Sequence, residues 1–252
     1  WKHAGLQLQR LQVPDRWCCR AAGRNRRTGS SSNAKCLSSN VKPRVCSTGK
    51  MTSHCTPGVP LTRATRSATL TTTFLIIPGL REHVSNHWQT LLAAKLPQVQ
   101  IVPPLEADKL SCAARVEAIQ HALEAIDGPV ILVAHSAGVM MVAHWAQQHS
   151  RPIKGALLAT PADVESAFPA GYPGTEVLEA NGWLPIPRQP LPFPSILAAS
   201  RNDPLARFER LEQLASDWHS ELLDLGEVGH LNPASGFGEG PLAEVLLRQI
   251  DS

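Results

Sequence analysis

The distribution of hydrophobic residues changes character near residue 73. From Thr73 onward, short apolar runs alternate with stretches in which apolar residues recur every three or four positions. The first pattern is typical of buried strands and the second of amphipathic helices, so their alternation predicts a parallel sheet covered by helices. Residues 1–72 show little sustained periodicity of either kind.

The predicted elements follow one another in a regular order. Strands are expected at 74–77, 99–102, 130–133, 155–159, 195–199 and 221–225. Helices are expected at 86–95, 113–126, 137–149, 205–218 and 242–250. Residues 163–194 are rich in Pro and Gly, which predicts a long excursion or small lid that is not a core element. We therefore expect an α/β fold with a mostly parallel sheet of about six strands flanked by helices.

Charge divides the chain at the same boundary. Residues 1–72 contain 13 Lys and Arg against the single acid Asp15, whereas the remainder contains 11 basic and 20 acidic residues. A folded part this acidic lacks the Lys and Arg footprint that neutralises nucleic-acid phosphates, so we expect no nucleic-acid partner. Two units are predicted: a basic leader at 1–72, disordered or non-native, and one folded domain at 73–252.

The leader also bears on localisation. It is basic and Ser-rich, which fits an organelle transit peptide, but it lacks the apolar segment of a secretory signal. No stretch of the chain approaches the ~20 apolar residues of a membrane span. We favour a leader without function and expect a cytoplasmic protein with no membrane association.

Five of the six cysteines lie in the leader, at positions 18, 19, 36, 46 and 55, and Cys112 alone lies in the folded part. The leader cysteines show no Cys-x-x-Cys pair of the kind that structural zinc sites use. Zinc binding there stays open but is not favoured. We expect the domain to need no disulfide and to bind no metal.

A candidate nucleophile follows the best buried-strand candidate. The segment from Ala134 to Gly138 places Ser136 between that strand and the next helix, with small residues two positions before and after it. A sharp strand-to-helix turn requires small residues at these positions, because larger side chains would collide with the neighbouring backbone. The sequence therefore predicts a nucleophile elbow at Ser136, although a plain helix N-cap is the alternative. His135 should be turned away from the catalytic position.

A candidate base and oxyanion donors occur at other strand ends. His230 lies in a loop after the last predicted strand, where a neutral imidazole could accept the serine proton. His83 and His87, which follow the first strand, are weaker alternatives. The backbone N–H of Ala137 and that of Leu80, which follows Gly79 in the first loop, are the candidate oxyanion donors.

Several separated motifs resemble one family, the retinoblastoma-binding-protein-9-like or YdeN-type serine hydrolases, over residues 73–252. The matching stretches are Ile77-Pro78-Gly79, His87-Trp88, His135 to Gly138, Ser200 to Pro204, Gly229 to Asn232, and Ser235 to Gly238.

The resemblance implies a small α/β-hydrolase fold, with Ser136 as nucleophile, Asp203 as the triad acid and His230 as the base. It also makes Gly79, His87 and Trp88 candidate pocket residues. The Leu-x-Cys-x-Glu motif behind retinoblastoma binding is absent, because residues 123–127 read Leu-Glu-Ala-Ile-Asp. That partner is not expected.

The acid has a competitor within the sequence. Asp163 and Asp203 each follow a predicted strand, and Asp203 precedes Pro204, a pairing that can also cap a helix beginning at Leu205. We favour Asp203, since it follows the second strand after the elbow strand and precedes His230, whereas Asp163 begins the Pro-rich excursion.

These residues predict hydrolysis of a small ester, thioester or amide through an acyl-serine intermediate, without a metal or organic cofactor. The expected partner is a small acyl substrate. A non-catalytic module that uses the same scaffold to bind a ligand or partner is the alternative, and carbon–carbon or peroxide chemistry on the same triad is a third possibility.

Overall fold

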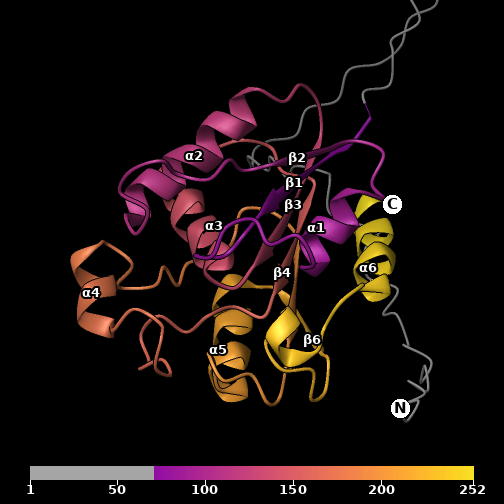
Figure 1. Ribbon diagram of the computed structural model, residues 1–252. Coiled ribbons are helices and arrows are strands. Elements are labelled where there is room, and N and C mark those ends of the chain that lie inside the picture. The colour runs from indigo at the N-terminus through magenta and orange to yellow at the C-terminus, as the bar shows by residue number, and fades with distance from the viewer. Residues whose placement is uncertain (1–70) are drawn as a thin grey trace, which may run out of the picture. The chain divides into compact units, whose positions relative to one another are not determined.

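Six parallel strands form one sheet in the order β2-β1-β3-β4-β5-β6 (Figure 1). The computed structural model describes residues 71–252, so the predictions of a disordered leader and of zinc binding fall outside the described residues. The strands are β1 (Thr73–Ile77), β2 (Val99–Ile101), β3 (Val130–His135), β4 (Gly155–Ala159), β5 (Ser195–Ala199) and β6 (Glu221–Asp224).

Helices cover both faces of this sheet (Figure 1). On one face lie α2 (Cys112–Glu124), α3 (Ala137–Gln148) and α5 (Phe208–Trp218), and on the other lie α1 (Trp88–Ala93) and α6 (Pro241–Asp251). The described residues therefore have the α/β arrangement that the alternating pattern predicted.

The central strand β3 shows why a continuous apolar run forms such a sheet. It pairs with β1 on one side and β4 on the other, and all six of its residues are buried. Leu132 packs into the core beneath α2, α3 and α5, whereas Ile131 and Val133 pack beneath α1 and α6. A strand covered on both faces must be apolar at every position, which is why no alternation with polar residues appears.

Two of the element boundaries that differ from the prediction lie beside candidate site residues. Strand β3 continues two residues further, to His135, before the turn at Ser136. Helix α5 begins at Phe208 with Arg207 as its N-cap, so the predicted start at Leu205 is wrong, and the alternative that Asp203 caps this helix is not realised. The Leu205 carbonyl accepts instead from the Asp163 N–H at 3.0 Å, which holds this segment in a turn against the loop after β4.

The excursion at 163–194 is more closely integrated than predicted. It contains a short helix, α4 (Thr175–Ala180), and it contributes Val164, Leu178 and Trp183 to the core with no solvent exposure. The Trp183 indole N–H donates to the Leu110 carbonyl at 2.7 Å. The prediction that this segment lies outside the core is therefore wrong: Pro and Gly interrupt regular secondary structure but leave the apolar side chains free to pack.

Candidate active site

Ser136 lies at the carboxyl end of β3, in the sharp turn that leads into α3. Its backbone angles, φ 59° and ψ −128°, are strained for a residue other than Gly. Although Ser136 occupies the N-cap position of α3, its side chain makes no capping hydrogen bond. The plain N-cap alternative therefore does not explain this serine.

The small residues around Ser136 are required by the close approach of the loop after β1. A Cβ atom on Gly138 would collide with the Ile77 carbonyl oxygen and would lie 2.8 Å from that of Pro78. Ala134 is fully buried in β3. The spacing of small residues seen in the sequence thus reflects backbone contact between β1 and the start of α3.

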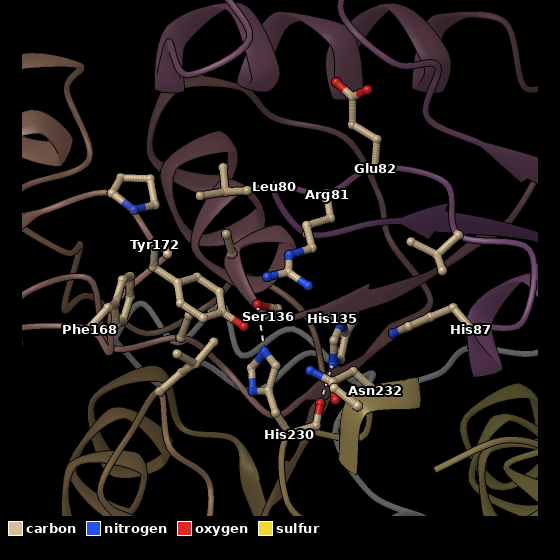
Figure 2. Close-up of a pocket in the computed structure, with 18 of the residues that line it drawn as sticks. Leu80, Arg81, Glu82, His87, His135, Ser136, Phe168, Tyr172, His230 and Asn232 are labelled. Atoms are coloured by element: carbon tan, nitrogen blue, oxygen red, sulfur yellow. Dashed lines mark hydrogen bonds between the residues drawn. The ribbon is translucent and has the colours of Figure 1, made fainter. Parts of the chain in front are cut away.

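Ser136, His230 and Asp203 form a continuous chain of hydrogen bonds, and Figure 2 shows its first bond, between Ser136 and His230. His230 Nε2 lies 2.8 Å from the Ser136 Oγ, and Nδ1 lies 2.9 and 2.8 Å from the two carboxylate oxygens of Asp203. A carboxylate can only accept, so Nδ1 carries the proton in neutral His230 and Nε2 is free to accept from the serine hydroxyl. His230 and Asp203 are 3% and 8% exposed, which shields their interaction from water.

The competing acid, Asp163, is engaged elsewhere. Its carboxylate accepts from Arg210 Nε at 3.1 Å and from the Ser166 hydroxyl at 2.6 Å. Burial alone would raise the pKa of Asp163, but these hydrogen bonds hold the pKa below its ordinary value. Arg210 also contacts Glu165 at 2.6 Å, so Asp163 belongs to an ion-pair network that ties the excursion to α5.

Side-chain hydrogen bonds join the loop that carries Asp203 to the loop that carries His230. Asn202 Oδ1 accepts from the Gly229 N–H at 2.7 Å, and Ser200 Oγ accepts from the Val228 N–H at 3.2 Å. The His230 N–H donates to Ser235 Oγ at 3.0 Å. The motif residues around Asp203 and His230 therefore have a structural role, because these contacts fix the distance between the two loops.

His135 contacts the backbone of His230 and does not bond to Ser136. Its Nε2 lies 2.9 Å from the His230 carbonyl oxygen, to which it donates, and its ring packs against His87 and His230. Burial, reinforced by the neighbouring histidines, holds the pKa of His135 well below its usual range. His135 is therefore a neutral donor that positions the His230 loop.

The histidine at the start of α1 lines the pocket. His87 caps α1, with Nδ1 accepting from the Gln89 N–H at 3.3 Å. Burial, and secondarily the nearby His230, lowers the pKa of His87 to about 4, so the side chain is neutral at physiological pH. Trp88 lies in the core and meets His135 edge-on, and His83 is exposed outside the pocket.

The two predicted oxyanion donors lie beside Ser136. Ala137 and Leu80 both line the pocket, and neither backbone N–H has an acceptor within residues 71–252. A Cβ atom on Gly79 would lie 3.1 Å from the Ser136 Cβ, so the first loop approaches the serine closely. Two unpaired N–H groups near a serine can receive a developing oxyanion.

These groups open into one cavity of about 390 Å³. Gly79, Leu80, His87, Ser136 and His230 line it, together with residues that the sequence analysis did not single out. The latter are Phe168 and Tyr172 from the excursion, Arg81 after the first loop, and Lys109 and Arg115 around the start of α2. No local motif marks these residues, because they come from three separate segments that meet only when the excursion folds over the carboxyl ends of the strands.

Residues 71–252 contain neither a membrane-spanning helix nor a cluster of metal ligands. No helix in this range is long and apolar enough to cross a membrane. Within the same range, no group of three or more His, Cys, Asp or Glu side chains is arranged to hold a metal ion.

The fold defines the class of protein first: a six-stranded parallel sheet with a strained serine turn after its third strand is an α/β hydrolase. Within that class, the chain belongs to the serine hydrolase family, whose model matches residues 74–249. The resemblance inferred from the separated motifs is thereby confirmed.

Solved structures agree with this assignment. A putative YdeN-like hydrolase from Pectobacterium atrosepticum is 33% identical, with a TM-score of 0.58 over 71% of this chain and 89% of its own. The ydeN gene product of B. subtilis is 18% identical, with a TM-score of 0.58 over 71% and 98%. Est1E from Butyrivibrio proteoclasticus, at 12% identity and a TM-score of 0.54 over 74% and 91%, shares the fold. No curated protein sequence matches the chain.

Proposed function

We propose that this chain hydrolyses a small ester, thioester or amide through an acyl-serine intermediate. The observation that carries the proposal is the hydrogen-bonded chain from Ser136 through His230 to Asp203, of which Ser136 and His230 line the cavity. Membership of the serine hydrolase family supports the reaction class. The substrate is a small acyl compound, since the cavity holds about 390 Å³.

In the first half of the reaction, Ser136 Oγ attacks the substrate carbonyl carbon while its proton moves to His230 Nε2. The negative oxygen that forms accepts hydrogen bonds from the Ala137 and Leu80 N–H groups. Collapse of this intermediate breaks the bond to the leaving group, which takes the proton from His230, and leaves the acyl group on Ser136.

In the second half, water attacks the acyl-serine carbonyl as His230 Nε2 accepts a proton from that water. The second tetrahedral intermediate expels Ser136 Oγ, which recovers its proton from His230, and the acid product departs. Asp203 stays ionised throughout, orients the imidazole and stabilises the imidazolium. The enzyme returns to its starting state.

A fluorophosphonate probe tests the proposal, because it forms a covalent bond only with an activated serine. We expect the full chain to be labelled, and we expect Ser136→Ala to lose both labelling and turnover of p-nitrophenyl esters. Ser150→Ala, which changes an exposed serine after α3, is the matched control and should keep both. Labelling that persists in Ser136→Ala would refute the assignment, and labelling without turnover of esters, thioesters or amides would favour the non-catalytic alternative.

A further inference from the structure

The charge of the cavity opposes the charge of the domain that contains it. Residues 73–252 carry 11 basic and 20 acidic residues, yet the lining contains three cations, Arg81, Lys109 and Arg115, and one carboxylate, Glu82. An acidic protein with a cationic cavity attracts anions locally against its overall field. The lining therefore indicates a preference for substrate charge.

Only one of the three cations is compensated. Glu82 lies 3.5 Å from Arg115 and accepts from the Leu105 N–H at 3.3 Å, and Arg115 Nε donates to the Lys109 carbonyl at 2.7 Å. Arg81 and Lys109 form no ion pair with any carboxylate of residues 71–252. Two positive charges thus remain available to a ligand.

Arg81 is the better placed of these two. Its guanidinium carbon lies 5.2 Å from the ring centroid of Tyr172, a cation–π contact that restrains an otherwise exposed side chain. Figure 2 shows the guanidinium directed into the cavity near Ser136, on the side of the serine away from His230. A planar guanidinium in a cavity matches a carboxylate through two parallel hydrogen bonds.

The position of the Arg81 guanidinium relative to His230 decides which part of the substrate carries the charge. His230 must protonate the leaving group, so the leaving group lies on its side of Ser136 and the acyl group extends away from it. The aromatic rings of Phe168 and Tyr172, whose centroids lie 5.8 Å apart, form an apolar wall next to Arg81. An acyl chain along this wall would bring its far end to the guanidinium.

We propose that the substrate is an ester, thioester or amide whose acyl group ends in a carboxylate, which Arg81 binds while Lys109 adds to the positive field. This inference rests on the proposed function and names the substrate class of the same site. It predicts selectivity by charge, because a neutral acyl group leaves the guanidinium without an acceptor.

The test compares p-nitrophenyl monoesters of glutaric and adipic acid with the same compounds methylated at the free carboxylate. Each pair shares a leaving group and differs in one acyl charge, and Ser136→Ala gives the uncatalysed background. We expect the acidic esters to have the higher kcat/KM. We expect Arg81→Gln to lower the ratio of acidic to methylated ester by roughly tenfold or more, the loss typical of a charge-assisted hydrogen bond, and Arg81→Glu to lower it further.

Arg248→Gln is the matched control, because it removes the same charge from an α6 side chain that is 70% exposed and does not line the cavity. Its ratio should equal that of the unaltered chain. An unchanged ratio in Arg81→Gln, a preference for the methylated esters, or no turnover of either ester by protein that the probe labels would overturn the inference. In each of these cases, fluorophosphonate labelling of Ser136 shows that the proposed nucleophile survives, whereas loss of labelling in the unaltered chain would refute the proposed function itself.

Discussion

Asp203→Asn should lower activity and leave stability nearly unchanged, whereas Asp163→Asn should lower stability and leave most of the activity. In Asp203→Asn, the amide can still accept the Leu205 N–H, which lies 2.8 Å from Asp203 Oδ1, so the loop should keep its conformation. The amide nitrogen that replaces Oδ2, however, can only donate to His230 Nδ1, which favours the tautomer with its proton on Nε2, where the imidazole cannot accept from Ser136. We expect kcat to fall by about 10⁴ with little change in the melting temperature.

Asp163→Asn should have the reverse effect. Asp163 is fully buried and accepts two hydrogen bonds from Arg210, whose side chain is 21% exposed, so neutralising it leaves a partly buried guanidinium short of one counter-charge. Glu165 still contacts Arg210 at 2.6 Å, which limits the loss in the free energy of unfolding to about 2 to 3 kcal/mol. For a domain of this size the melting temperature should fall by roughly 5 to 10 °C, with kcat reduced only a few-fold.

The assay is the initial rate of p-nitrophenyl ester hydrolysis together with thermal unfolding followed by circular dichroism. Both variants are measured beside the unaltered chain at a temperature where all three are folded. An active Asp203→Asn beside an inactive but stable Asp163→Asn would make Asp163 the orienting acid and refute the role given to Asp203.

Two further substitutions probe the elbow and the histidine cluster. Gly138→Ala should destabilise the fold by about 1 to 3 kcal/mol in urea unfolding and lower kcat, because its Cβ would displace the Ile77 carbonyl; unchanged stability and activity would contradict the close packing. The pKa of His87 is lowered to about 4, so between pH 6.5 and 4 the unfolded chain binds a proton that the folded chain does not. Stability should therefore fall by about 2 kcal/mol between pH 7 and pH 5, less so in His87→Asn, which retains a capping acceptor without a titrating group. An equal loss in both proteins would show that His87 is not the cause.

Local pattern alone predicted the order of strands and helices and the position of the elbow. The apolar run at β3 can be satisfied only by burial on both faces, and the small residues on either side of Ser136 are needed wherever a strand turns sharply into a helix. The contacts that impose these constraints come from distant segments, but each constraint restricts the residue types within one short stretch, so one sequence suffices to read them. The place of His230 after the last strand made it a candidate base, and the family motifs added Asp203 as the acid.

Tertiary structure decided what depends on contacts between distant segments. Asp163 and Asp203 both follow strands, and only the packing of Arg210 against one of them and of His230 against the other distinguishes their surroundings. Tyr172 lies within the Pro-rich excursion, where no periodicity marks it, and it meets Arg81 only because the excursion folds back over the sheet edge. The triad candidates were therefore visible in the sequence, whereas the charge and the walls of the cavity came from chain segments that the sequence pattern could not bring together.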